Sequence, residues 1–80
     1  MKINFSDRVA MDPGIMTGKP IIRGTRIPVD MIVRMVAQGI GEKTILEEYP
    51  RLTRDDIRAA LTYAAGVVAD EDVFPVAAIA

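Results

Sequence analysis

Carboxylates and arginines are the side chains that could do chemistry in this sequence, because its 80 residues include no histidine and no cysteine. The usual general base, the commonest metal ligand and all thiol chemistry are therefore excluded. The carboxylates gather in three short runs, Glu47-Glu48, Asp55-Asp56 and Asp70-Glu71-Asp72. Neighbouring side chains on a helix point about 100° apart, so none of these runs converges on one metal or acid–base site. We expect them to cap helices or face solvent, with no metal and no cofactor.

The segment from Gly14 to Pro20 is the nearest approach to a phosphate-binding loop. It has one residue too few between its glycines for the P-loop pattern. Pro20 also stands where that pattern needs a hydroxyl side chain to contact magnesium. We therefore expect that the protein is not an enzyme.

Arginines in the second half of the chain are candidates for DNA binding. Arg54 and Arg58 lie four residues apart and would share one face of a helix, where either could bind guanine. Arg51 before that helix and Thr62 farther along it complete a first group of predicted DNA-binding residues. Two aspartates lie between Arg54 and Arg58, so the alternative is ion pairing of Asp with Arg on a solvent-exposed helix.

A second basic group, Lys19, Arg23 and Arg26, supplies the only charges between Asp12 and Asp30. On an arm or wing these side chains would bind phosphates and give salt-dependent affinity without reading base sequence. The alternative is that Arg23 and Arg26 pair with acidic residues of the helices or of a second subunit, since the rigid guanidinium fork suits carboxylates.

Three helices are predicted to position these residues. The first runs from about residue 29 to residue 38, where Gly39 suits a left-handed cap. The second runs from about residue 42 to residue 49 and is stopped by Pro50. The third begins after the N-cap Thr53, has Asp56 as capping-box partner, and continues to about residue 72. The link at residues 50–53 gives the last two helices the outline of a helix-turn-helix. The predicted buried face of the third helix continues through Ala60, Leu61, Ala64, Ala65 and Val68.

Short β structure is predicted ahead of the helices. Alternating apolar residues within residues 1–11 suit one strand or two, and Asp12-Pro13-Gly14 opens an exposed loop at residues 12–19. Residues 20–29 suit an edge ribbon bent at Gly24, because prolines near both ends exclude a central strand. We predict a single, mainly α domain. It has a β ribbon and basic loop at residues 1–29, a three-helix homeodomain-like helix-turn-helix bundle at 30–72 and an apolar tail at 73–80.

Apolar residues in excess of one small core predict self-association. A chain of 80 residues can bury only a marginal core of its own. Its apolar, uncharged tail at residues 73–80 would be a solubility liability if it were exposed to water. The tail could fold back on its own bundle, cross to the mate in a homodimer, or dock on a separate protein. The predicted interface residues are Met31 and Met35 of the first helix, with Val73, Phe74, Val76 and Ile79 of the tail.

Two unusual segments carry a family resemblance, namely Gly18-Lys19-Pro20-Ile21-Ile22-Arg23-Gly24-Thr25-Arg26 and Tyr49-Pro50 followed by Leu52-Thr53. Over roughly residues 9–65 the chain resembles domain-of-unknown-function family 433. The resemblance implies a three-helix, homeodomain-like or winged-helix-like fold in a small bacterial or archaeal protein. It also implies the antitoxin of a VapBC-like pair, whose toxin resembles a PIN-domain ribonuclease.

The formal net charge of −1 means that the chain lacks the electrostatic footprint of a strong nucleic-acid binder, so DNA would have to bind local patches. With no membrane-spanning apolar run and no signal-peptide pattern, we expect a cytoplasmic protein that has no membrane partner. We expect an antitoxin-like protein that neutralises a PIN-like toxin by binding it and autoregulates its own promoter DNA. The alternative, which the net charge favours, is a dimeric protein–protein interaction module that binds no DNA.

Overall fold

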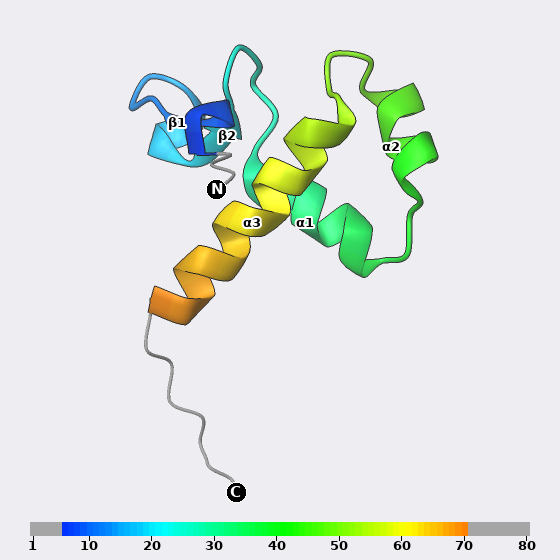
Figure 1. Cartoon of the computed structure of the whole chain (residues 1–80). Helices are drawn as coiled ribbons and strands as arrows, with labels where there is room; N and C mark the ends of the chain where they lie inside the picture. Colours follow the sequence, from blue (N-terminus) through cyan, green and yellow to red (C-terminus); the bar gives the residue numbers. More distant parts are fainter. Residues whose placement is uncertain (1–5, 71–80) are drawn as a thin grey trace, which may run out of the picture.

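The computed structural model describes residues 6–70, which form three helices and a small two-stranded sheet (Figure 1). The helices are α1 (Val29–Ala37), α2 (Glu42–Glu48) and α3 (Arg54–Asp70). Strands β1 (Val9–Met11) and β2 (Pro20–Ile22) precede them, with the short 3-10 turns η1 (Ser6–Arg8) and η2 (Met16–Gly18). The predicted mainly α architecture with a short N-terminal β element is confirmed. Within residues 6–70, no helix combines the length and the hydropathy needed to cross a bilayer.

Helix α1 ends in a backbone motif that its glycine makes possible. Gly39 has a φ of 84°, a conformation that L side chains rarely adopt. The Gly39 N–H donates to the Val36 carbonyl at 3.0 Å, and the Ile40 N–H donates to the Met35 carbonyl at 3.1 Å. This pair of bonds is the Schellman motif, which satisfies carbonyls that the helix end leaves free. The predicted left-handed cap at Gly39 is confirmed.

The corner between α2 and α3 also follows from local chemistry. Tyr49 leaves the helical region with φ −127° and ψ 79°, as expected of a residue before Pro50. The Leu52 N–H then donates to the Tyr49 carbonyl at 2.9 Å and closes the turn. Thr53 accepts the Asp56 N–H at 3.2 Å through its hydroxyl, and Asp56 accepts the Thr53 N–H at 2.9 Å through its carboxylate. The predicted capping box is therefore present, although its acid is the shorter Asp.

The small sheet pairs differently from the predicted ribbon. Strand β2 lies antiparallel to β1 with Val9 opposite Ile22 and Met11 opposite Pro20. The two halves of residues 20–29, which were predicted to form the ribbon, meet in one isolated bridge between Ile21 and Pro28. Prolines lack the N–H that a longer ladder needs, and the partner of β2 is instead β1, which comes earlier in the chain. The predicted exposed loop at residues 12–19 also differs from a plain loop, because it contains η2.

Helix α3 is the element on which the other elements pack. It runs between the small sheet and α2 and extends beyond both at its C-terminal end (Figure 1). Its first half contributes Ile57, Ala59 and Ala60 to the core. The remaining core residues come from the other two helices, from both strands and from the turn before α3, namely Val9, Ile22, Val29, Ile32, Ile45 and Leu52. Of the predicted buried residues of α3, Ala60 is buried and Ala64 is half-buried, whereas Leu61, Ala65 and Val68 are exposed.

Candidate nucleic-acid interface

Arg51 joins the helix-turn-helix corner to the basic turn after β2. Its guanidinium Nη2 donates to the Gly24 carbonyl at 3.0 Å, although 27 residues separate the two along the chain. Arg51, Arg23 and Arg26 thereby line one hollow of about 530 Å³, which we call the arginine concavity. Asp12 is the acidic residue on its lining. The concavity brings together arginines from the two groups that the sequence suggested separately.

A tight turn holds Arg23 and Arg26 at the concavity. Gly24 adopts a φ of 82°, and the Thr25 N–H donates to the Ile22 carbonyl at 3.0 Å. The Thr25 hydroxyl donates to the same carbonyl at 2.7 Å and accepts the Ile27 N–H at 3.0 Å. This hydroxyl therefore serves the turn, and the turn fixes the two flanking arginines.

The predicted basic group at residues 19–26 is divided by the structure. Arg23 donates through Nε to the Asp7 carbonyl, while Arg26 is exposed and has no ion pair within residues 6–70. Lys19 does not line the concavity and lies 3.5 Å from Asp30 of α1, measured from Nζ to Oδ2. The pairing with helix carboxylates that the sequence allowed for Arg23 and Arg26 is instead made by Lys19.

The first turns of α3 carry ion pairs to other elements. Arg54 pairs with Glu42 at the start of α2, with 3.1 Å between Nε and Oε1. Arg58 and Thr62 are exposed, and Arg58 has no ion pair among the described residues. The Asp–Arg pairing along one helix that the sequence allowed is therefore replaced by contacts across elements. Arg58 and Thr62 are therefore polar side chains of α3 that are available to a ligand outside the protein.

Arg8 is the residue of this region that the sequence did not indicate. Its Nη1 donates to Asp56 Oδ1 at 3.1 Å, and its Nη2 lies 3.6 Å from Asp55 Oδ2. Asp56 is buried, with 6% of its surface exposed, so its charge is matched by Arg8 and by the capping hydrogen bond from Thr53. Arg8 therefore offsets the negative charge of the two aspartates at the start of α3. No local pattern could have identified Arg8, because 48 residues separate it from Asp56.

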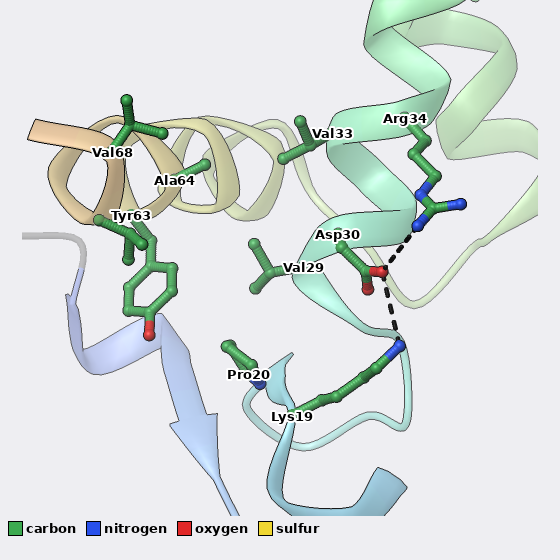
Figure 2. Close-up of a pocket in the computed structure, with 10 residues that line it drawn as sticks. Lys19, Pro20, Val29, Asp30, Val33, Arg34, Tyr63, Ala64 and Val68 are labelled. Atoms are coloured by element: carbon green, nitrogen blue, oxygen red, sulfur yellow. Dashed lines mark ion pairs between the residues drawn. The ribbon is translucent and has the colours of Figure 1, made fainter. Parts of the chain in front are cut away.

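A second concave surface lies between α1 and the C-terminal half of α3, where it forms an apolar groove of about 460 Å³ (Figure 2). Lys19, Asp30 and Arg34 lie at its edge, and Figure 2 shows Lys19 and Arg34 both directed at the Asp30 carboxylate. Val68 at one end is 62% exposed. We call this surface the α1–α3 groove; its apolar lining consists of Pro20, Val29, Val33, Tyr63, Ala64, Val67 and Val68.

The predicted interface methionines lie away from this groove. Met31 and Met35 are half-buried, Met35 packs against the core, and the Tyr49 hydroxyl lies 3.9 Å from the Met31 Sδ atom. The other predicted interface residues, Val73, Phe74, Val76 and Ile79, lie outside the described residues. Homodimer formation through either set stays a prediction.

The acidic runs form no compact cation site in the part of the chain that the structure describes. No three acidic side chains gather there at the spacing that a metal ion needs. Asp55 and Asp56 contact Arg8, and Glu42 contacts Arg54. The described carboxylates at the start of α3 thus serve ion pairs and the helix cap.

One solved structure and two proteins of known sequence are similar to parts of this chain. A crystal structure of a DUF433 member protein from Anabaena variabilis superposes with a TM-score of 0.73 at 37% sequence identity, covering 81% of this chain and 64% of that one. A protein of Sinorhizobium fredii described as "Uncharacterized protein y4eO" is 41% identical over 56 residues, which are 70% of this chain and 25% of that protein. An uncharacterized protein of Archaeoglobus fulgidus is 55% identical over 29 residues, covering 36% of this chain and 81% of that protein.

The family model described as "Protein of unknown function (DUF433)" matches residues 9–64. The match begins at β1 and ends within α3, so it contains the arginine concavity and the whole helix-turn-helix corner. The chain belongs to the DUF433 family.

Proposed function

We propose that this protein is a DNA-binding, antitoxin-like member of a type II toxin–antitoxin pair. The observation that carries the DNA-binding part is the convergence of Arg23, Arg26 and Arg51 on one concavity beside the helix-turn-helix corner. Three guanidinium groups on a protein with a net charge of −1 make a local positive surface of the kind that binds phosphates. Binding would therefore depend on this surface and not on overall charge.

The location of the concavity suits a phosphate contact. In a helix-turn-helix protein, the second helix of the motif lies in the major groove and its N-terminal residues contact base edges. Arg51 lies in the turn immediately before α3, so the concavity would bind the DNA backbone beside that groove. Arg58 and Thr62, which are exposed on α3, would then contact bases. Phosphate contacts would supply affinity and the contacts from α3 would supply sequence preference.

The antitoxin part of the proposal is supported by the family resemblance of the two segments at residues 18–26 and 49–53. In this part, residues 73–80 would cover the active site or entrance of a PIN-like ribonuclease toxin, and the helical domain would hold the complex on its promoter. The apolar composition of that segment supports such a contact, because an uncharged segment exposed to water is an interaction surface or a solubility liability. The protein would act by binding, without catalysis of its own.

Fluorescence anisotropy with the protein's own upstream DNA and a scrambled duplex, each at several salt concentrations, tests the DNA-binding part. Replacing Arg23, Arg26 and Arg51 by alanine should weaken binding to both duplexes. The slope of log affinity against log salt concentration, called the salt slope, should fall in magnitude by about 1 for each phosphate that the variant no longer binds. Arg58→Ala should mainly reduce the preference for the upstream duplex, by about 1–3 kcal/mol if it contacts a base.

Arg34→Ala is the matched control, because Arg34 is an exposed arginine at the edge of the α1–α3 groove and not at the concavity. It should leave both affinity and salt slope nearly unchanged. Equal weakening in Arg34→Ala and in the concavity variant would show only a general charge effect. Absence of binding by the unmodified protein would reject the DNA-binding part.

The second candidate function is a protein–protein interaction module that binds no DNA. The observation that favours it is the apolar surface left exposed, to which Val36, Leu61, Val67 and Val68 contribute. Equal binding to the two duplexes, or none, combined with a stable complex with the product of a neighbouring toxin gene would favour this candidate.

A further inference from the structure

The α1–α3 groove is open among the described residues, and an apolar segment follows α3 in the sequence. We propose that residues 73–80 fold back and bind in this groove, so that the apolar tail covers the apolar C-terminal half of its own α3. These residues lie outside the described part of the structure, and the inference rests on the groove, on the sequence of the segment and on where α3 ends. It does not depend on the proposed DNA-binding function, and in the antitoxin role the same segment would have to leave the groove to bind a toxin.

The chemistry of the groove fits an uncharged segment. The charges at its edge satisfy one another, since Asp30 Oδ2 lies 3.5 Å from Lys19 Nζ and 3.7 Å from Arg34 Nη2. An apolar segment in the groove would leave none of these three charges without a partner. A charged segment would find no such partner on the floor, which is made of Val29, Val33 and Tyr63 with neighbouring alanine and valine side chains.

The segment has the complementary composition. Residues 73–80 read Val-Phe-Pro-Val-Ala-Ala-Ile-Ala and contain no charged or hydrogen-bonding side chain. Burying an apolar side chain such as Phe74 is favourable in proportion to the area removed from water. Pro75 has no N–H, so docking buries one donor fewer than a typical residue would require. The acidic residues just before the segment, Glu71 and Asp72, suit a solvent-exposed link.

The length of the chain also fits. Tyr63 and Val68 are five residues apart on α3, which places them about 7.5 Å apart along the helix axis. Eight extended residues span up to about 26–29 Å, so the segment can reverse direction after α3 and still cross the groove toward Val29. Because the link is short, the local concentration of the segment at its own groove is on the order of millimolar, which favours this site over that of a second copy in dilute solution.

A nitroxide label tests the proposal on the full chain, because the sequence contains no cysteine. In ¹⁵N-labelled protein carrying Ala77→Cys with the nitroxide, the amide signals of Val33, Tyr63 and Ala64 should lose intensity relative to the same protein with a diamagnetic label. Signals of Lys43 and Glu47, which lie on α2 away from the groove, should keep theirs. The loss of intensity should persist when the sample is diluted with ¹⁴N protein that carries no nitroxide, because the contact is intramolecular.

Two substitutions test whether the tail binds this groove specifically or any exposed apolar surface. Val67 and Val36 are both 37% exposed, but Val67 lines the groove and Val36 does not. Val67→Asp should abolish the loss of signal, whereas Val36→Asp should leave it intact. A further experiment without nitroxide compares the ¹⁵N spectra of wild type and Phe74→Ser. The chemical-shift differences between them should concentrate at the groove residues.

The outcomes are distinct. Loss of signal that appears only when ¹⁵N wild-type protein is mixed with nitroxide-labelled ¹⁴N protein would assign the groove to a second copy and overturn the proposal. No loss at the groove, together with no shift changes there in Phe74→Ser, would also overturn it. Unchanged signals of the core residues Ile32 and Ile45 would show that each variant keeps its fold.

Discussion

The two halves of α3 differ in how completely the chain covers them. In residues 54–60, Asp56, Ile57, Ala59 and Ala60 are buried, and the cap and Arg8 bind the polar groups. From residue 61 to residue 69 no side chain is buried, although several are apolar. Burial in a small domain is limited by how many elements can surround one helix, and the contacts of α1, α2, β1 and η1 with α3 leave no buried side chain in its second half. The first half therefore supplies the buried core residues of α3, and the second half leaves an apolar surface for another segment to cover.

The largest expected effect on stability comes from truncating one apolar side chain to alanine in each half of α3. Ile57→Ala should lower the free energy of unfolding by about 2–5 kcal/mol, because it empties a core site that is 3% exposed. Val68→Ala should change it by about 0.5 kcal/mol or less, because that side chain is 62% exposed and alanine is the better helix former. Urea denaturation followed by circular dichroism measures both. Similar decreases in the two variants would mean that another segment packs on the second half as tightly as the core packs on the first.

A smaller effect distinguishes the two aspartates at the start of α3. Asp56→Ala should cost about 2 kcal/mol, because it removes the capping bond from the Thr53 N–H and the Arg8 hydrogen bond at a buried position. Asp55→Ala should cost between zero and about 1 kcal/mol, because its pair with Arg8 is exposed to solvent and screened.

Thermal unfolding of the aspartate variants, with Arg8→Ala and the double variant Arg8→Ala/Asp56→Ala, completes a cycle that isolates the Arg8–Asp56 interaction. The destabilisation of the double variant should be smaller than the sum of the two single destabilisations. Strict additivity would show that the hydrogen bonds of the cap, and not Arg8, account for the stability of this helix start.

The parts of the structure that the sequence predicted are those decided within a few residues. The Gly39 cap, the stop at Pro50 and the Thr53 capping box each depend on neighbours no more than five positions away. The contacts that build the candidate interface are long-range, as in Arg51 with Gly24 and Arg8 with Asp56. Helical periodicity correctly placed Val68 on the apolar face of α3. How far along α3 other elements pack against that face depends on how the helices cross, which periodicity does not predict.

The smallest expected effect concerns a glycine within the exposed half of α3. A Cβ added at Gly66 would meet no atom within 4 Å, so Gly66→Ala should raise the free energy of unfolding by about 0.5–1 kcal/mol through helix propensity. The same substitution at Gly39 should lower it by about 1–2 kcal/mol, because the φ of 84° there is unfavourable for alanine. Melting temperatures measured by calorimetry should move in opposite directions. A Gly66→Ala variant that is less stable than wild type would mean that another part of the molecule, or a second copy, approaches the backbone at this position, and would extend the covered part of α3 beyond residue 60.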